Sequence, residues 1–386
     1  MEAARTYDIV LFGGTGFTGG LTAEYLAANA SATTKWALAG RNMDKLEQLR
    51  DRLGVDVPLV KADVTDKDSI DAVAASTRVV ITTVGPYIEY GEPLVRACAE
   101  NGTDYTDLTG EPEFVDRMYL KYNELAETTG ARLVHACGFD SIPHDLGVLF
   151  TVEQLPEGVP LKVRGVVQSN GSPSGGTVAS AMTAFSRLRE NMQAAKQRKQ
   201  AEQHANGRVA KAEMGKPHRE AEMGAWVLPM PTIDPQVIVR SARALERYGP
   251  DFTYGHYIAV KNLPQAVGLP LAVGGIFGIA QVGPARRWLM GRLPAGTGPS
   301  AEKREQAWFR VRFTGEGGGK RVVTQVAGGD PGYTETSKML AESALCLAHD
   351  DLPQTAGQVT TAQAMGDTLI ARLKRAGMTF EVLEAS

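Results

Sequence analysis

The segment Cys137–Gly147, with the sequence CGFDSIPHDLG, contains a thiol, two carboxylates, a hydroxyl and an imidazole. These are the groups that nucleophilic catalysis and metal binding use. A hydrolase serine lies on a strained G-x-S-x-G turn, and Ser141 lacks that sequence around it. Asp140, His144 and Asp145 share a helix face only in part, so we predict no metal site in this segment. Two interpretations remain: Asp140 or His144 donates a proton to a substrate, or Asp140 or Ser141 caps a helix.

A second chemical motif is the glycine-rich segment Gly13–Gly20, GGTGFTGG, which follows the apolar run Tyr7–Phe12. Glycine allows a turn with positive φ and lets the backbone approach a pyrophosphate closely. The start of the helix that follows offers free N–H groups and the positive end of a helix dipole. We therefore predict a dinucleotide-phosphate site. Its expected residues are Gly13, Thr15, Gly16, Phe17 and Thr18.

The residues after the second predicted strand indicate which dinucleotide binds. An acidic residue there would bind the ribose diol of NAD, but the sequence has Arg41 and Asn42. A guanidinium group can hold a 2′-phosphate in a planar fork, so the sequence predicts NADP. Asp63 follows the third strand, where it either meets the adenine amine or caps the next helix.

Two further segments are expected to line the cofactor nearer the nicotinamide. The fourth strand ends in TVGPY, in which Val84, Gly85 and Pro86 suit a tight backbone passage past the middle of the cofactor. Tyr87 either faces the nicotinamide or packs in the core. Gly138 allows close approach to the nicotinamide ring.

These motifs lie between strands and helices that alternate through the first part of the chain. The predicted strands are near-continuous apolar runs, which is typical of a parallel sheet covered on both faces. Six such units predict a doubly wound, Rossmann-type dinucleotide-binding domain. The strands are expected within Tyr7–Phe12, Lys35–Gly40, Val57–Asp63, Arg78–Gly85, Gly102–Gly110 and Ala131–Cys137.

After Gly147 the pattern changes to alternating apolar and polar residues, as in the segment LKVRGVVQ. The segment Ala307–Gly328 predicts a hairpin around a glycine turn. We therefore predict an α/β protein with a second α+β domain built on a mixed or antiparallel sheet. The expected domains are 1–147 for NADP binding, 148–329 for substrate and dimerisation, and 330–386 for the C-terminal helices.

The composition excludes several classes of protein. The chain has 386 residues, a net charge of −3 and a pI near 6.1, which does not favour nucleic-acid binding. Cys98, Cys137 and Cys346 lie far apart, so we expect neither a disulfide framework nor a zinc knuckle, and no metal site elsewhere. This cysteine pattern and a first apolar run too short for a signal peptide predict a cytoplasmic protein.

The segment Asn262–Ala285 contains no charged residue and is followed by RRWLMGR. Its length approaches a membrane span, but Pro264, Pro270 and several glycines argue against a simple spanning helix. Two interpretations remain. In the first, the segment is buried or forms the wall of an acyl-binding site. In the second, residues 262–292 make a peripheral contact with the inner face of the plasma membrane. In the second case the interfacial residues would be Arg286, Arg287, Trp288 and Arg292.

A series of motifs resembles the saccharopine dehydrogenase-like oxidoreductases, and within them the enoyl reductase subfamily. The motifs are GGTGFTG, AGRN, VGPY, DLTGE, GFDSIPHDLG, SGGT, GDPGYTETSKMLAESALCL and GMTFEV. The resemblance covers nearly the whole chain and implies an NADP-type Rossmann domain, a second domain with a mixed sheet, and C-terminal helices that pack on the first domain. It also implies trans-acting reduction of a double bond in acyl chains growing on a polyketide synthase, in the synthesis of complex lipids.

We therefore expect an NADPH-dependent reductase of a lipid-like or polyketide acyl chain, carried on a protein or free, and acting as a homodimer. The candidate proton donors follow the ends of strands and are Tyr87, Tyr105, Glu111, Asp140, Ser141 and His144. Of these, we assign Tyr87, Asp140 and His144 to catalysis. SGGT (Ser174–Thr177) either holds a carrier phosphate or is an ordinary helix cap. The alternatives are a reductase of an imine or carbonyl, and a non-catalytic protein that binds NADP as a sensor or assembly factor.

Overall fold

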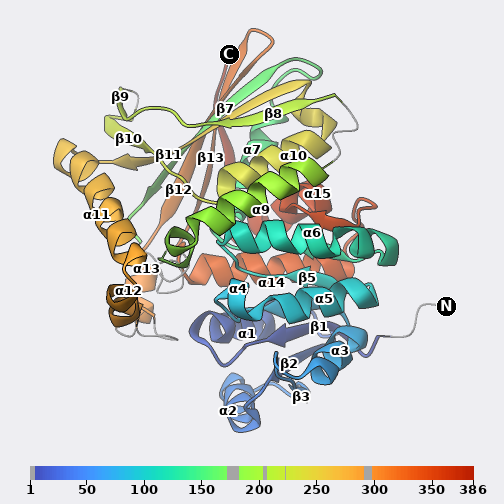
Figure 1. Ribbon diagram of the computed structural model, residues 1–386. Coiled ribbons are helices and arrows are strands. Elements are labelled where there is room, and N and C mark those ends of the chain that lie inside the picture. Colours follow the sequence, from blue (N-terminus) through green and yellow to red (C-terminus); the bar gives the residue numbers. More distant parts are fainter. Residues whose placement is uncertain (1–4, 172–181, 203–206, 222, 291–297) are drawn as a thin grey trace.

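The computed structural model describes residues 5–171, 182–202, 207–221, 223–290 and 298–386. Two sheets organise the described chain (Figure 1). One is a seven-stranded sheet formed mainly by the first third of the chain, and the other is an eight-stranded sheet formed by the rest. The predicted combination of a Rossmann-type sheet with a second mixed sheet is confirmed.

All strand pairs of the first sheet are parallel, and β4 and β5 continue from β1 on the side opposite to β2 and β3. This order places the topological switch point between β1 and β4, where such sheets bind dinucleotides. In sheet order the strands are β14 (Gly357–Val359), β6 (Arg132–Val134), β5 (Asp104–Thr106), β4 (Thr77–Thr82), β1 (Tyr7–Phe12), β2 (Trp36–Gly40) and β3 (Leu59–Lys61).

Alternate residues of β1 face two separate hydrophobic cores. Ile9 and Leu11 pack with α1, α2 and α14, whereas Val10 and Phe12 pack with α3, α5 and α6. The sheet is therefore buried on both faces, which explains its near-continuous apolar strands. The helices are α1 (Phe17–Asn29), α2 (Met43–Leu53), α3 (Lys67–Ser76), α4 (Tyr87–Tyr90), α5 (Glu92–Asn101), α6 (Pro112–Thr129) and α14 (Thr334–His349).

The second sheet is mixed. β7 lies at its centre, pairing parallel with β11 and antiparallel with β12, and the predicted hairpin is the antiparallel pair β12–β13. β8 and β10 both pair with β11, along successive parts of its length. The strands are β7 (Leu161–Ser169), β8 (Val209–Glu213), β9 (His218–Glu220), β10 (Ala225–Pro229), β11 (Asp251–Val260), β12 (Phe309–Gly317), β13 (Lys320–Gly328) and β15 (Thr379–Ala385).

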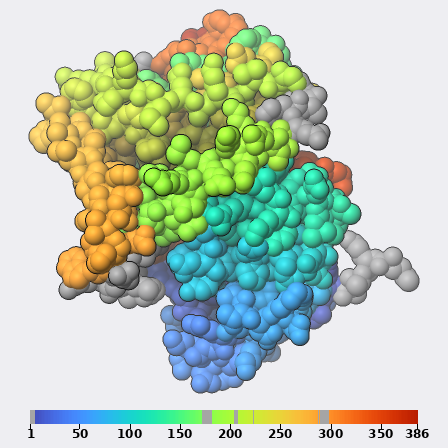
Figure 2. Space-filling view, viewed as in Figure 1, coloured from blue at the N-terminus to red at the C-terminus, as the bar shows by residue number. Residues whose placement is uncertain are grey.

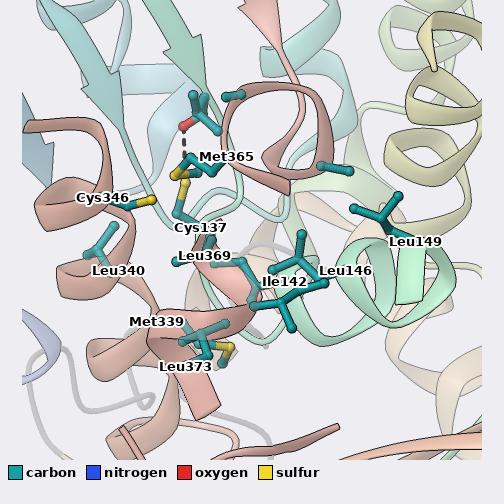
Figure 3. Packing of buried hydrophobic residues seen from close by; sticks show 14 of the residues in the cluster. Cys137, Ile142, Leu146, Leu149, Met339, Leu340, Cys346, Met365, Leu369 and Leu373 are labelled. Carbon is teal, nitrogen blue, oxygen red and sulfur yellow. Dashed lines mark hydrogen bonds between the residues drawn. The ribbon is translucent and has the colours of Figure 1, made fainter. Parts of the chain in front are cut away.

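Helix α7 (Ile142–Val152) joins the two sheets. It follows β6 of the first sheet and packs on β7, β12 and β13 of the second. Gly147 permits this packing, because a Cβ there would overlap the ring of Phe313 and lie 3.0 Å from Val326. Figure 3 shows Ile142, Leu146 and Leu149 of α7 among the buried side chains of α14 and α16.

The C-terminal part of the chain contributes to both sheets. α14 packs against α1, β1 and β4, β14 extends the first sheet beside β6, and β15 pairs with β13 in the second. Neither of these strands was predicted from the sequence. α15 (Thr361–Ala364) and α16 (Gly366–Arg375) lie between them in the chain.

A buried ion network connects α6 to the helices of the second domain. Asp116 of α6 pairs with Arg198 of α9 and with Arg240 of α10, and Glu202 pairs with Arg198 at 2.6 Å. The C-terminal part of α9, which is polar and contains Arg198, therefore packs partly against the rest of the protein. The remaining helices are α9 (Leu188–Ala201), α10 (Asp234–Ala244), α11 (Leu263–Gln281), α12 (Gly283–Met290) and α13 (Ala301–Glu305), with a 3-10 turn, η1 (Glu246–Tyr248).

Candidate cofactor and active site

The predicted phosphate loop has the geometry that a bound pyrophosphate needs. Gly13 has a φ of 93°, and a Cβ at Gly19 would overlap the carbonyl oxygen of Gly13 and lie 2.7 Å from Thr83 Oγ1. Gly16 occupies the N-cap of α1, so no capping side chain takes up the first amides of the helix. Thr15 and Gly16 are exposed, and Phe17 and Thr18 are half-buried. The loop therefore suits an anion held by backbone N–H groups.

Arg41 and Asp63 lie close together at the ends of β2 and β3. Hydrogen bonds from the amide and hydroxyl of Thr65, at 3.0 and 2.8 Å, lower the pKa of Asp63, and the charge of Arg41 contributes to the same shift. Arg41 is exposed, so its guanidinium is available to a ligand. This corner of the sheet can thus offer a cation and a carboxylate to an adenosine phosphate.

Helix caps account for two neighbouring polar residues. Asn42 accepts a hydrogen bond from the amide of Lys45 at 3.0 Å and caps α2, which leaves only its amide group to donate to a ligand. The cap of α3 is Asp66, whose side chain accepts from Ser69 N, and not Asp63. The capping alternative for Asp63 was therefore wrong.

The segment after β4 passes directly behind the phosphate loop. Thr83 donates to the carbonyl of Gly13 at 3.1 Å, and the side chain of Val84 occupies the space where a Cβ of Gly13 would lie, 2.7 Å away. The Gly85–Pro86 peptide bond is cis. These residues lie where the sequence predicted a tight passage beside the cofactor.

The hydroxyl of Tyr87 is hydrogen-bonded to the main chain. It donates to the carbonyl of Thr82 and accepts from the amide of Leu108, both at 3.2 Å, and the side chain is buried. Burial, with a contribution from Asp107, raises its pKa well above its usual value. This arrangement favours the packing interpretation of Tyr87 over proton donation.

Two buried carboxylates hold the loops at the carboxyl ends of β4, β5 and β6 together. Asp107 accepts hydrogen bonds from Tyr105 at 2.9 Å and His135 at 2.7 Å, and from the amides of Thr109 and Ala136. Glu111 accepts from the amides of Tyr87 and Ile88 at 3.0 and 2.9 Å. Both residues therefore position the loops around the expected nicotinamide site.

Gly138 is required by protein packing. A Cβ at this position would lie 2.7 Å from Leu108 and 3.1 Å from Thr336, so two side chains fill the space beside it. Thr336 also accepts a hydrogen bond from the amide of Phe139 at 3.1 Å. These contacts fix the backbone that leads into Asp140.

Asp140 is the candidate donor that remains partly accessible. It lies beside Gly110, where a Cβ would be 3.3 Å from its carboxylate oxygen, at the same edge of the sheet as the phosphate loop. Desolvation by the surrounding protein raises its pKa to about 6. A carboxyl group with this pKa carries a proton more often near neutral pH than an exposed one does. Asp140 does not cap α7, whose N-cap is Ser141, and the Ser141 side chain makes no capping hydrogen bond.

His144 points toward the second domain. Its Nε2 atom lies 3.7 Å from Asp234 Oδ1, and Asp234 Oδ2 lies 3.6 Å from His256 Nε2. All three side chains are buried, and burial lowers the pKa of His144 and brings that of His256 to about 3. The sequence analysis did not identify Asp234 or His256. Asp234 begins α10 and His256 lies within β11, so both are far from His144 in the chain. Their spacing in the sequence does not indicate a shared site.

The motif GDPGYTET places the C-terminal segment against the phosphate loop. Asp330 accepts hydrogen bonds from the amides of Tyr333 and Thr334, both at 3.0 Å, and so holds the turn before α14. Tyr333 stacks edge-on against Phe17 with 4.9 Å between ring centroids, and Ser337 donates to the carbonyl of Thr18 at 3.2 Å. The C-terminal segment thus supports the start of α1. SGGT lies outside the described residues.

Fold and site together define a dinucleotide-dependent oxidoreductase, and comparisons with known proteins agree. Residues 9–134 match the family model of the saccharopine dehydrogenase NADP binding domain. A trans-acting enoyl reductase of Mycobacterium tuberculosis is 36% identical over 97% of this chain and 97% of its own. One of Mycobacterium ulcerans is 35% identical over 98% of each chain.

Among solved structures, apo saccharopine dehydrogenase (L-Glu forming) from Saccharomyces cerevisiae is similar with a TM-score of 0.58 at 13% identity. This likeness covers 98% of the present chain and 100% of the yeast chain, and it shows the shared fold. The chain belongs to the saccharopine dehydrogenase-like oxidoreductases, in the branch of the trans-acting enoyl reductases. It is an NADP-dependent oxidoreductase, as the sequence predicted.

Proposed function

We propose that this protein is a trans-acting enoyl reductase that reduces a carbon–carbon double bond of a lipid-like or polyketide acyl chain. The observation that carries the proposal is the position of Asp140, a partly accessible carboxyl group at the same sheet edge as the phosphate loop. The names of relatives that share more than a third of its residues along nearly the whole chain support it.

NADPH, when bound, supplies the hydride for the reduction. The residues that would hold it are the phosphate loop from Gly13 to Thr18, Arg41 at the 2′-phosphate and Asp63 near the adenosine. The loop fits a pyrophosphate because the glycines leave no side chain in its path and α1 begins without a side-chain cap.

The protein must also supply a proton. Reduction of an enoyl thioester adds hydride to the β-carbon and a proton to the α-carbon, and it stabilises negative charge on the thioester oxygen between the two. We assign proton donation to Asp140. His144 is held neutral and buried beside Asp234, and Tyr87 is bonded to the main chain, so both are less suited to the role.

A substrate panel tests this proposal against its alternatives. Purified protein is mixed with NADPH and with enoyl, keto or imine substrates of equal chain length, and loss of NADPH absorbance is followed. Turnover restricted to the enoyl substrates supports the proposal. Turnover of keto or imine substrates alone would assign a different reductase, and tight NADPH binding with no turnover would indicate a sensor.

The term trans-acting in the names of the relatives supports an acyl chain carried by a polyketide synthase as the substrate. The proposal predicts faster turnover of a carrier-bound enoyl chain than of the same chain on a small thiol. Equal rates for the two substrates would remove the carrier from the proposal. We also expect a homodimer, which light scattering of the purified protein tests, and a location in the cytoplasm, which cell fractionation tests.

Helix α11 supports a peripheral membrane contact. It is long and apolar enough to cross a membrane by length and composition, and it lies along one side of the molecule (Figures 1 and 2). Its exposed apolar side chains are spread around the whole helix circumference, so no single face is reserved for the protein. They are Leu263, Val267, Leu269, Leu271, Val273, Phe277 and Ile279.

The topology excludes a single crossing of the bilayer by α11. The strand before it, β11, and the strand after it, β12, both pair with β7 in one sheet, so both ends of the segment return to the same side. The helix would therefore lie in the interface, with exposed Trp288 of α12 at the headgroup level and Arg286 close to anionic lipid. Arg292 lies outside the described residues.

Sedimentation with vesicles tests the membrane contact. Wild type is expected to bind anionic vesicles more strongly than zwitterionic ones, and Leu271→Asp combined with Val267→Asp is expected to abolish binding. Met192→Asp on α9, which replaces an equally exposed apolar residue, serves as the control. A double variant that binds vesicles as well as wild type would refute the membrane contact. If wild type is a dimer and the double variant is a monomer, α11 instead contacts a second copy of the chain.

A further inference from the structure

We propose that His144, Asp234 and His256 form a binding site for one divalent transition-metal ion, with zinc as the best match. Each residue offers one ligand atom, and the three atoms lie within 4.8 Å of one another. The residues come from three elements, α7, the start of α10 and the middle of β11, so the fold brings them together. This site is separate from the phosphate loop and stands independently of the proposed reaction.

The spacing of the ligand atoms is close to that of a coordinated set. Nitrogen and oxygen ligands about 2.0–2.1 Å from a zinc ion in tetrahedral geometry lie roughly 3.4 Å from one another. Here the two imidazole nitrogens lie 3.7 and 3.6 Å from the two carboxylate oxygens of Asp234. The three ligand atoms lie within 4.8 Å of one another, so side-chain shifts on the order of an ångström would complete the coordination.

The polar atoms of the cluster lack the partners that buried groups normally have. Within the described residues, Asp234 Oδ1, His256 Nε2 and His144 Nδ1 are fully buried and accept or donate no hydrogen bond. A buried polar atom without a partner costs about 1–3 kcal/mol. Two of these atoms, Asp234 Oδ1 and His256 Nε2, face the space between the three residues, where a cation would satisfy them both.

Outer hydrogen bonds already orient two of the ligands. Tyr254 bonds to His256 Nδ1 at 2.9 Å, which turns Nε2 toward Asp234, and Thr232 donates to Asp234 Oδ2. Metal-binding imidazoles generally make such a bond through the second ring nitrogen. Tyr254 and Thr232 are therefore positioning residues for the proposed site.

The ion pairs of Asp234 also favour a cation. Among the described residues, the only basic side chains within 4 Å of the Asp234 carboxylate are those of His144 and His256, and no lysine or arginine pairs with it. A divalent ion would balance the carboxylate.

Two imidazoles and one carboxylate indicate the kind of metal. This donor set with an open fourth position is one that zinc sites use, and imidazole suits zinc better than magnesium or calcium, which prefer oxygen ligands. Such an ion would join α7, the helix that links the two sheets, to two elements of the second domain. The expected effect is a more stable junction between the domains.

Metal content and cobalt spectroscopy test the site. Tag-free protein from zinc-supplemented growth should contain about one zinc per chain, and cobalt substitution should give the visible absorption of a four- or five-coordinate ion. Both signals should disappear in Asp234→Asn, which keeps the shape of the side chain, and in His256→Gln, which keeps a polar side chain without the imidazole. His349→Ala, at an exposed histidine away from the cluster, should retain the metal of wild type.

Thermal unfolding tests the site without an activity assay and without protein that already contains metal. Zinc added to metal-free wild type should raise the unfolding midpoint, as any ligand of the native state does, and should leave Asp234→Asn unchanged. A variant that fails to fold is replaced by Thr232→Val, which removes only an outer hydrogen bond and should weaken zinc binding about tenfold or more. If metal-free wild type gains no cobalt spectrum and no zinc-induced shift, the proposal is overturned and the three residues form a buried His–Asp–His cluster without a metal.

Discussion

At the scale of single residues, the phosphate loop gives the sharpest prediction. Gly19→Ala places a methyl group against the carbonyl oxygen of Gly13, so the loop must shift at a cost of about 1–3 kcal/mol. NADPH affinity should fall at least tenfold, measured by fluorescence titration. Gly20→Ala, the next residue of α1, meets its nearest atom at 3.5 Å and is the matched control. Equal losses in the two variants would contradict the role of Gly19.

Arg41 should determine the preference for NADPH. Arg41→Ala removes the one charged donor predicted to hold the 2′-phosphate, and a charge-assisted hydrogen bond contributes about 1.5–3 kcal/mol. We expect a loss of about tenfold or more in affinity for NADPH and little change for NADH, measured by isothermal titration. Arg50→Ala is the control. Arg50 lies in α2, the helix that follows Arg41, and pairs with Asp51, so its removal should leave both affinities unchanged. An unchanged NADPH preference in Arg41→Ala would place the 2′-phosphate elsewhere.

Asp140 should be needed for turnover and not for cofactor binding. Asp140→Asn keeps the shape of the side chain and removes the acid, so kcat should fall about 10²–10⁴-fold while NADPH affinity stays within error. Asp68→Asn, at an exposed carboxylate of α3, is the control. Full turnover in Asp140→Asn would move the proton donor to another group or to water.

At the scale of elements, the end of α7 carries a pH-dependent contribution to stability. Burial, together with the carboxylate of Asp367, raises the pKa of Glu153 from 4.5 to about 7. The folded protein therefore holds a proton that the unfolded chain releases near pH 4.5. The associated stabilisation is fully present below that pH and is lost as the pH rises through 7.

Glu153→Gln should remove this dependence. Relative to wild type, the variant should gain about 1 kcal/mol between pH 5 and pH 8, a figure reduced for the partial exposure of the side chain. Urea unfolding at the two pH values measures the change. Glu157→Gln, at a mostly exposed neighbour, should follow wild type at both. A variant whose stability falls with pH as steeply as that of wild type would show that Glu153 is not the titrating group.

The sequence predicted the elements that depend on local pattern. The strands from β1 to β6 are buried on both faces and therefore apolar, and glycines mark both the phosphate loop and the β12–β13 turn. It missed β14 and β15, which pair with strands from distant parts of the chain. Asp234 and His256 were missed for the same reason, because only the packing of α10 against α7 and β11 brings them to His144.

At the scale of the whole molecule, the two sheets are connected by α7 and by the C-terminal segment. α7 follows β6 of the first sheet and packs on β7, β12 and β13 of the second, and the C-terminal segment supplies β14 to the first sheet and β15 to the second. The segment from Asp330 to Ser337 supports the phosphate loop. The sheet edge near Asp140 therefore lies at the junction of the cofactor domain and the second domain.

The central claim is that the protein reduces a carbon–carbon double bond with hydride from NADPH, and isotope transfer tests it most directly. Wild type is incubated with NADPH deuterated at the transferred position and with an enoyl thioester, and the product is analysed by mass spectrometry. We predict a saturated product with one deuterium at the β-carbon and a solvent-derived proton at the α-carbon. An unchanged enoyl chain, with deuterium found only in the product of a keto or imine substrate, would contradict it.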